Sequence, residues 1–531
     1  MSNANACLPN SNRTFIKSIV FGLLFALISP NFAHSTPPTA PVPPSPAEQR
    51  ALAAISPDEL KGDLSFLASD TLRGRFTPSP GLEVAAEFIA SKFRAAGLEP
   101  GGDHDYFQMA EMVDRHLPSM NSGLTIVIGG RTVTWPASAV TVEATSQSAH
   151  LDQAPVVLLP SKDPSLLKGL DFTGKAIVSV ESDAPDMTPD QMRARRRQYR
   201  AFDQAAAATG ALVNVTVLQH KRSFFGAPRL LFADQAAASR TASISVVSEE
   251  LAKFMSENKA APASLTVDIP APQDTKVFVK NVIGILRGSD PLLAKTAVLL
   301  TAHYDHIGTV DTASGMTMQT NADSADRIYN GANDDGSGTV SVIEIARAIA
   351  KFQPRPKRSI VFMTFFGEER GELGSQFYGK HPVFPISQTI ADLNLEQVGR
   401  TDSTKGPQLN NASVTGFTYS DLTGFLIRAG KRVGIDVYRD AEASDAYFTR
   451  SDNDALAEQG IPAHTLCVAF DYPDYHGLGD EWPKVDYKNM AKVDRMVMLA
   501  LVDLANTDKP PQWNAQNPKT EPFRAARAAA R

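Results

Sequence analysis

The strongest constraint on the fold is an alternation of apolar runs and amphipathic segments that begins at Val277. The apolar runs have the length of strands, and the segments between them space their apolar residues as a helix does. The pattern predicts strands at 281–287, 296–302, 359–366 and 389–395, and helices at 338–352, 421–434 and 486–506. Such strands between amphipathic helices indicate an α/β fold with a mixed, mostly parallel central sheet flanked by helices.

The chain before this pattern has two parts. Helical spacing predicts helices at 57–67 and 81–97. From about Ser119 to Pro272, short β-like runs dominate, at 124–128, 156–159, 176–180, 212–217 and 244–247. One basic helix, 189–209, interrupts them, and we expect its arginines to form a solvated helix face rather than an anion site. They are Arg193, Arg195, Arg196, Arg197 and Arg200. This stretch carries no catalytic constellation, and we interpret it as a smaller, β-rich domain inserted into the first.

The N-terminus has the pattern of an export signal. Arg13 and Lys17 precede the apolar run 18–28, and the small residues Ala33 and Ser35 are spaced like a cleavage site. The run is too short to span a bilayer comfortably, which favours a cleaved signal over an uncleaved anchor. We therefore expect an exported protein, periplasmic or secreted, with no stable membrane association after cleavage. Cys467 would then be the one remaining cysteine, so no internal disulfide is expected.

These patterns divide the 531 residues into six segments. They are a signal peptide (1–35), a Pro-rich spacer (36–46), the first part of the main α/β domain (47–118), the inserted domain (119–275), the second part of the main domain (276–510) and a flexible C-terminal tail (511–531). The net charge of −6 gives no indication of nucleic-acid binding.

Histidines and carboxylates gather where the predicted strands end. His303 and Asp305 are two residues apart on a continuing strand, so they point to one face, and a nearby carboxylate commonly orients a metal-binding His. Further groups lie in the Gly-rich turn 330–338, at 366–371, at 392–399 and at 474–480. Taken singly, each has a simpler interpretation, such as a satisfied polar strand end or a helix N-cap at Asp334 or Asp335.

Taken together, these groups predict a metal site. Loops beyond the carboxyl ends of parallel strands are where α/β sheets place ligands. Two histidines and three carboxylates suit a pair of zinc ions with one bridging carboxylate, and a further, unligated Glu would then act as a base.

The order of the motifs resembles the di-zinc peptidase family that contains secreted bacterial leucine-type aminopeptidases, glutamate carboxypeptidase and the inactive transferrin receptor. The motifs are His-x-Asp (303–305), Gly-Ala-Asn-Asp-x-x-Ser-Gly (331–338), Phe-Gly-Glu-Glu (366–369), Asn-Leu-Glu (394–396) and Tyr-His (475–476). Segments 67–75 and 88–98 are similar to the N-terminal region of the family. The inserted stretch resembles the protease-associated domain that many members carry.

The resemblance implies two Zn²⁺ ions per chain and a ligand set for them. His303 and Glu396 would hold one zinc, and Glu369 and His476 would hold the other. Asp334 would bridge the two ions.

The resemblance also implies roles for three residues that hold no metal. Asp305 would orient His303, Glu368 would be the general base and then the general acid, and Tyr475 would donate to the oxyanion. The chain departs from the family at two positions. It has Glu396 where many members have Asp, and Asn453 where relatives often carry a His near the substrate. Three further polar residues are expected to be structural or to support the ligands: His306, His464 and Asp480.

The resulting prediction is a zinc-dependent aminopeptidase, a hydrolase that removes N-terminal residues from peptides. A carboxypeptidase of the same family is the alternative, and it needs a cation near the substrate's carboxylate; the candidates are Arg370, Arg400, Arg439 and Arg450. A non-catalytic receptor or scaffold should have lost metal ligands, whereas every position is filled here. A glutaminyl cyclase-like acyltransferase uses a single zinc, against which the two-metal set argues.

Overall fold

The computed structural model describes residues 42–182, 187, 189–220, 229–237, 241–258, 261–312 and 325–530. The predicted signal peptide and the spacer up to residue 41 lie outside these residues, as do the side chains of Arg193, Arg196, Arg197 and Arg200. Within the described part, no helix has both the length and the apolar character that crossing a membrane requires.

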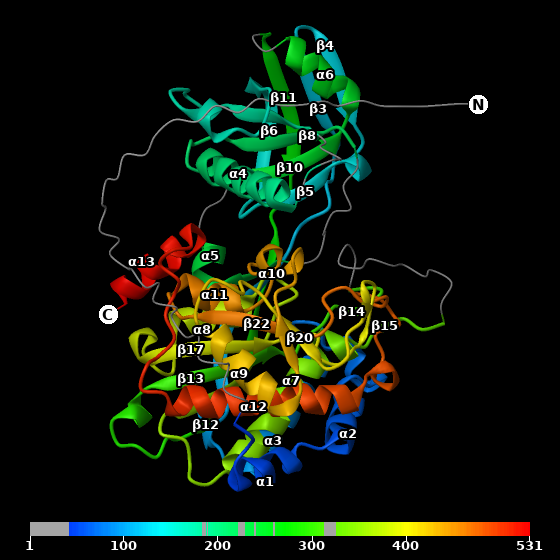
Figure 1. Ribbon diagram of the computed structural model, residues 1–531. Coiled ribbons are helices and arrows are strands. Elements are labelled where there is room, and N and C mark those ends of the chain that lie inside the picture. Colours follow the sequence, from blue (N-terminus) through cyan, green and yellow to red (C-terminus); the bar gives the residue numbers. More distant parts are fainter. Residues whose placement is uncertain are drawn as a thin grey trace, which may run out of the picture. The chain divides into compact units, whose positions relative to one another are not determined.

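A ten-stranded mixed sheet forms the centre of the main domain, in the order β21-β20-β22-β17-β13-β16-β12-β2-β9, with β1 paired to β12 (Figure 1). Its middle strands are parallel: β22 (Ala463–Cys467), β17 (Thr389–Leu395), β13 (Ala297–His303) and β16 (Ser359–Phe365). At one edge β20 (Asn411–Val414) pairs in parallel with β21 (Asp436–Tyr438) and antiparallel with β22. The other strands are antiparallel: β12 (Gln273–Leu286), β2 (Phe107–His116), β1 (Glu99–Pro100) and β9 (Arg229–Phe232). The predicted mixed α/β sheet is confirmed, and its parallel strands lie together at the centre.

Helices cover both faces of this sheet, because alternate residues of a strand point to opposite sides. Val298 and Leu300 of β13 belong to a core shared with α1 (Pro46–Ala54), α2 (Pro57–Leu67), α3 (Pro80–Ala96), α7 (Gly338–Ala350), α9 (Thr423–Val433) and α12 (Tyr487–Asn506). Ala297 and Leu299 belong to a second core, shared with α8 (Leu373–Lys380) and α11 (Asn453–Glu458). Figure 1 shows α3, α7 and α12 on one side of the sheet and α8 and α11 on the other.

The helix boundaries follow capping signals in the sequence. Ser56 accepts the backbone N–H of Asp58 at the start of α2, and Ser79 caps α3. Gly97 ends α3 with a left-handed backbone, φ 76°, a conformation that glycine adopts without steric cost. The predicted helix 57–67 is confirmed at both ends, and the predicted helix 81–97 is shifted by one residue.

The inserted stretch forms a second, eight-stranded sheet with its own core of residues between Met120 and Ile269. The strand order is β4 (Arg131–Trp135), β3 (Leu124–Ile128), β11 (Ala263–Ile269), β6 (Ala149–Leu159), β7 (Ala176–Glu181), β8 (Val213–Leu218), β10 (Ala242–Val247) and β5 (Thr141–Ala144). Its helices are α4 (Pro189–Ala207) and α6 (Glu249–Glu257). Its likeness to a protease-associated domain stays a prediction.

One piece of the predicted insertion belongs to the main sheet instead. β9 pairs antiparallel with β2, with Met112 opposite Phe232, and the short helix α5 (Ala233–Ala237) follows it. At this junction the buried guanidinium of Arg115 donates to the Asp274 carboxylate at 2.6 and 2.8 Å and to the carbonyls of Thr145 and Ala236. The two sheets are therefore joined by more than the two chain crossings that an insertion requires.

The segment predicted as a flexible tail, 511–531, contains a helix in the described residues, and its flexibility stays a prediction. Helix α13 (Glu521–Ala529) ends the described chain, and Trp513 is buried against Phe523, with ring centroids 4.9 Å apart. Arg527 donates to the carbonyl of Ile386. The two aromatic side chains, Trp513 and Phe523, pack into the core of α8 and α11.

The remaining elements are short. They are β14 (Gly308–Thr309), β15 (Ile328–Tyr329), β18 (Asp402–Ser403), β19 (Gly406–Pro407) and α10 (Ala443–Ala446).

Candidate metal centre

The predicted ligands meet at the carboxyl ends of the central parallel strands. His303 is the last residue of β13, and Glu396 follows β17 directly. Glu369 comes after β16, beyond a turn at Gly367 with φ 68°. Asp334 lies between β13 and α7, and His476 lies in the loop after β22. The edge of the sheet thus gathers five side chains that are distant in sequence.

These side chains form two groups that share Asp334. In site 1, donor atoms of His303, Asp334 and Glu396 lie within 4.8 Å of one another. In site 2, His476 Nε2 lies 3.1 Å from Asp334 Oδ2 and 3.2 Å from Glu369 Oε2. The other oxygen of Asp334, Oδ1, lies 3.4 Å from His303 Nε2. One carboxylate oxygen of Asp334 therefore faces each site.

The donor set and its unpaired atoms fit metal ions. His303 Nε2, Asp334 Oδ2 and Glu369 Oε1 are buried, and none has a hydrogen-bond partner among the described residues. Buried polar atoms without partners are costly, so atoms that converge in this way indicate a ligand between them. Imidazole nitrogens and carboxylate oxygens are ligands that zinc prefers.

The charges of the site also favour cations. Burial raises the pKa of Glu368 well above its usual range, and the neighbouring Glu396 and Glu369 carboxylates raise it further. Burial likewise raises the pKa of Glu396 to about 7, with Asp334 adding to the effect. Burial lowers the pKa of His303, but the facing Glu368, Asp305 and Asp334 outweigh it and hold that pKa well above its usual value. Closely packed carboxylates of this kind are stabilised by protons or by metal cations.

Asp305 contacts both His303 and the backbone of Glu368. Its carboxylate accepts the backbone N–H of Glu368 at 3.1 Å and the hydroxyl of Thr77 at 3.0 Å. His303 Nδ1 lies 3.2 Å from the Asp305 carbonyl oxygen, which leaves Nε2 facing site 1. The predicted neighbours are thus brought together, and a buried residue from the N-terminal part of the chain, Thr77, supports them.

Two buried acids hold the loops that carry the ligands. Asp480 accepts the backbone N–H groups of Asn333 and Asp334 at 3.0–3.1 Å, as its predicted supporting role requires. Asp335 accepts the N–H groups of Gly338 and Gln397 at 3.0 and 3.1 Å, and so joins the Asp334 segment to the residue after Glu396. The sequence indicates Asp335 only as a possible helix cap, although its place directly after a candidate ligand is a signal for a wider role.

Sequence reasoning missed Arg75. Its guanidinium is 1% exposed and donates to four backbone carbonyls at 2.6–2.9 Å. Three of the four acceptors lie beside the site, in Tyr304, Asn330 and Gly331, and the fourth is in Leu67. The sequence indicated only a loop with two arginines, and which distant carbonyls one of them would reach is not visible in a local pattern.

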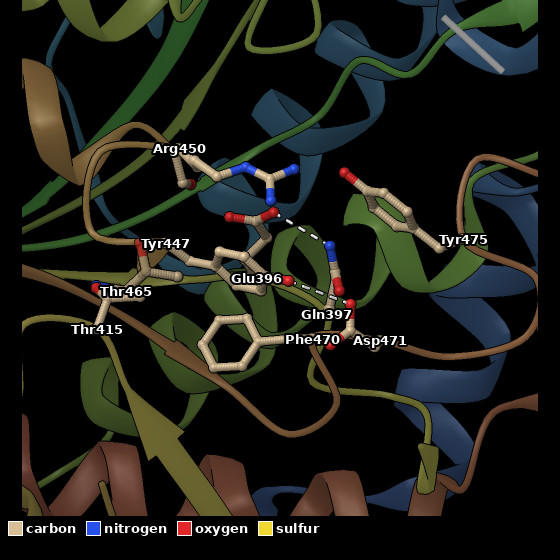
Figure 2. Close-up of a pocket in the computed structure, with 10 residues that line it drawn as sticks. Glu396, Gln397, Thr415, Tyr447, Arg450, Thr465, Phe470, Asp471 and Tyr475 are labelled. Atoms are coloured by element: carbon tan, nitrogen blue, oxygen red, sulfur yellow. Dashed lines mark hydrogen bonds between the residues drawn. The ribbon is translucent and has the colours of Figure 1, made fainter. Parts of the chain in front are cut away.

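A pocket enclosing about 400 Å³ of empty space, part of it open to solvent, lies beside Glu396. Figure 2 shows the Tyr475 hydroxyl and the Arg450 guanidinium pointing into it with the Glu396 carboxylate. The Tyr475 ring stacks on that of His476, with centroids 4.2 Å apart. Burial raises the pKa of Tyr475 well above its usual value, so its hydroxyl is a proton donor at neutral pH.

Three of the four arginines that could bind a substrate carboxylate are not among the residues that line this pocket. Arg400 is buried between Asp402 and Asp474, and Arg439 lies 3.5 Å from Asp445. Arg370 donates to the carbonyl of Thr77. Arg450 packs over the Tyr447 ring at 4.6 Å and lines the pocket.

Two polar residues near the site are structural. The His464 ring bonds to Ser420 Oγ at 2.6 Å and to the Thr415 carbonyl at 2.8 Å, which satisfies both of its nitrogens. Asn453 is fully buried, donates to the Phe448 carbonyl and accepts from Thr465, so it does not line the pocket. The departure from the family at Asn453 therefore lies at a buried position outside this pocket.

The part of the chain that carries this geometry matches a known protein family. Residues 281–501 match the profile of peptidase family M28, and all the candidate ligands fall in that range. This part of the chain belongs to peptidase family M28. Membership indicates a metallopeptidase, a hydrolase of peptide bonds. The inserted stretch lies outside the matched residues.

The individual relatives of this chain are distant. An aminopeptidase from Aneurinibacillus sp. strain AM-1 shares the fold, with a TM-score of 0.55 at 18% identity over 87% of this chain and 97% of the other. A probable leucine aminopeptidase of Arthroderma benhamiae is 27% identical over 33% of this chain and 48% of its own length. A vacuolar membrane protease of Pyricularia oryzae is 35% identical over 20% of this chain. The match spans only 9% of that protease.

Proposed function

We propose that the chain is a zinc-dependent exopeptidase, an aminopeptidase that hydrolyses N-terminal residues from peptides. The observation that carries the proposal is the convergence of imidazole and carboxylate donors, three of them with a buried atom that lacks a hydrogen-bond partner among the described residues, next to a carboxylate that is not needed as a ligand, Glu368. The names of similar proteins, a probable leucine aminopeptidase and an Aneurinibacillus aminopeptidase, favour an aminopeptidase among the possible exopeptidases.

Five residues would hold the metal ions. His303 and Glu396 would bind one zinc in site 1, Glu369 and His476 would bind the other in site 2, and Asp334 would contribute one oxygen to each. Bound zinc lowers the pKa of a water molecule towards neutrality and polarises a substrate carbonyl. The extra methylene of Glu396, compared with the Asp of many family members, is accommodated because its donor atom still lies within 4.8 Å of those of His303 and Asp334.

Glu368 would move the proton. Its carboxylate lies 3.9 Å from His303 Nε2, at the rim of site 1, and its backbone is fixed by the bond to Asp305. From there Glu368 accepts a proton from the attacking water and returns it to the leaving amine. Burial and the neighbouring carboxylates raise its pKa well above its usual range, a direction that makes a carboxylate a better proton acceptor.

Tyr475 would stabilise the oxyanion. Its hydroxyl points into the pocket and its ring is held against His476, so the donor is fixed before the substrate carbonyl gains charge. A preorganised donor of this kind contributes most in a pocket that excludes water.

A carboxypeptidase is the second candidate, and one observation favours it. The Arg450 guanidinium lies in the pocket beside site 1, where it could bind a terminal carboxylate of a substrate. The two candidates make opposite demands on the substrate, because an aminopeptidase needs a free amine and a carboxypeptidase needs a free carboxylate.

A panel of substrates tests the proposal. Aminoacyl amides with a free amine, and peptides blocked at the N-terminus, are assayed with and without a chelator. We expect cleavage of the aminoacyl amides, loss of that cleavage with chelator, and no cleavage of the blocked peptides. Cleavage of the blocked peptides alone would overturn the aminopeptidase assignment in favour of the carboxypeptidase.

We further propose that the protein is exported, to the periplasm or beyond, and acts on peptides there. The support is the charged and apolar pattern of residues 13–35, which lies outside the described residues. N-terminal sequencing of the protein from a periplasmic or medium fraction should find a chain that begins near residue 36. A cytoplasmic protein that keeps Met1 would contradict export.

A further inference from the structure

His306 follows Asp305 immediately and was expected to be structural. Its ring is fully buried and packs against Gly331, whose left-handed backbone (φ 56°) leaves no room there for a side chain. His306 Nε2 has no hydrogen-bond partner among the described residues, and Nδ1 has none there apart from the carboxylate of Glu369. The structural His464 shows the contrast, because both of its nitrogens are bonded. A buried imidazole with an unpaired nitrogen and only a carboxylate beside the other needs a further explanation.

The His306 ring faces site 2. Its Nδ1 lies 2.9 Å from Glu369 Oε1, an oxygen that also lacks a hydrogen-bond partner within the described chain. Donor atoms of His306, Asp334 and Glu369 lie within 4.8 Å of one another. The His476 ring meets the His306 ring edge to face, with centroids 5.6 Å apart.

These separations are those of neighbouring ligands on one ion. Two ligands about 2.05 Å from a zinc ion are about 2.9 Å apart at a right angle and about 3.4 Å apart at the tetrahedral angle. The contact of His306 with Glu369 (2.9 Å) and those of His476 with Asp334 and Glu369 (3.1 and 3.2 Å) fall in this range. Both histidines thus lie within ligand reach of the Asp334 and Glu369 carboxylates.

We propose that His306 is a further metal ligand of site 2. This inference rests on the proposed function. Site 2 then has four protein donors, from His306, Asp334, Glu369 and His476, whereas site 1 has three, from His303, Asp334 and Glu396. A zinc site with four protein ligands is closed, and one with three keeps a position for water or substrate. Site 2 should therefore bind zinc more tightly, and site 1 should carry the open position.

Cobalt reports the number of bound histidines directly. Each imidazole bound to paramagnetic Co²⁺ keeps one exchangeable ring N–H, whose proton resonance is strongly shifted. The full-length protein loaded with Co²⁺ is expected to show three such resonances, from His303, His306 and His476. His306→Ala should show two, and His381→Ala, which removes an exposed histidine outside the site, should keep all three.

Competition with a zinc chelator measures the second consequence. The unmodified protein should bind two zinc ions with unequal affinities. His306→Ala should lower the affinity of the tighter site by about 100-fold or more. Losing a residue that only supports a ligand costs about 10-fold to 100-fold in metal affinity, so the expected loss is at or above that range. His306→Asn can still donate a hydrogen bond to Glu369, so recovery of wild-type affinity in this variant would indicate that His306 only positions Glu369.

Two bound zinc ions with only two shifted N–H resonances in the unmodified protein would overturn this inference and leave the proposed function standing. No bound zinc at all would instead overturn the proposed function. Because the unmodified protein alone decides between these outcomes, the test holds even if His306→Ala fails to fold.

Discussion

The two sheets of this protein share a design and differ in the residues that come after their strands. Both have a run of parallel strands, β22-β17-β13-β16 in the main sheet and β6-β7-β8-β10 in the inserted one. After the main strands come Glu368, Glu369 and Glu396, with His303 as the final residue of β13. After β10 comes Ser248, which caps helix α6. Among the described residues, both groups able to hold a metal lie at the main sheet.

The difference shows that the parallel strands fix the position of a site at their carboxyl ends, and that the residues after the strands provide its metal-binding and catalytic side chains. In the inserted sheet, the residue after β10 satisfies a backbone N–H group at a helix start, which stabilises the fold. At the end of the main sheet, His303 Nε2 and Glu369 Oε1 are buried and unpaired among the described residues, which costs stability unless a ligand is bound. Buried groups without partners are therefore a better sign of function than the fold itself.

The largest expected effect is on turnover, and it comes from removing the proposed general base, Glu368. Glu368→Ala should lower kcat by about 100-fold to 10,000-fold, because general acid–base catalysis contributes roughly that much. The zinc content should be unchanged, since Glu368 is not a ligand. Steady-state kinetics on an aminoacyl amide together with metal analysis measure both quantities.

The matched control is Glu257→Ala, which removes an exposed carboxylate from α6 of the inserted domain. It should leave kcat and zinc content as they are. Near wild-type turnover in Glu368→Ala would show that the base assignment is wrong.

A smaller effect is expected at the junction of the two sheets. Arg115→Met leaves the Asp274 carboxylate and the carbonyls of Thr145 and Ala236 without their donor. Losing a buried, charged hydrogen-bonding group should destabilise the fold by about 1–3 kcal/mol, seen as a lower Tm. Arg131→Met, which breaks the exposed ion pair with Glu250, should change the free energy of unfolding by less than about 1 kcal/mol. Equal Tm shifts for the two variants would contradict the importance of the junction.

The smallest effect concerns a buried acid outside the site. Burial raises the pKa of Asp494 in α12 to about 8 from 3.8, although a hydrogen bond with Ser341 opposes the rise. Since the folded state holds this proton more tightly than the unfolded state, its contribution favours folding at low pH and is lost as the pH rises from about 4 to 8.

Asp494→Asn should therefore raise Tm more at pH 8.5 than at pH 5. The corresponding gain in the free energy of unfolding should be at most about a few kcal/mol. The zinc content should stay unchanged. Thermal unfolding of both proteins across this pH range measures the difference. A Tm gain that is larger at pH 5 would contradict the assigned direction. The result would show that a buried acid of the core affects stability alone, whereas the acids of the site also affect zinc binding.

The elements of the main domain could be predicted well from the sequence because each is encoded locally. The strand predicted at 389–395 is observed with the same bounds, and that predicted at 296–302 is shifted by one residue. The convergence of His303, Asp334 and Glu369 could also be predicted, because strand ends of a parallel sheet meet at one edge. Their roles as ligands stay predictions.

The features that could not be predicted depend on partners distant in sequence. No local pattern says that β9 leaves the inserted domain to pair with β2. None says that Trp513 and Phe523 meet and fix the C-terminal helix. The same holds for His306, because a lone histidine beside a candidate ligand has the same local sequence whether it bonds to the protein or faces a metal.

The central claim is that buried donors at the end of the main sheet hold two zinc ions through a shared Asp334. The most direct test is the zinc content of the purified protein and of Asp334→Ala, measured by mass spectrometry after dialysis against trace zinc. The account predicts about two zinc ions per chain in the unmodified protein and loss of bound zinc in the variant. Full metal occupancy in Asp334→Ala, or hydrolysis that a chelator does not affect, would contradict it.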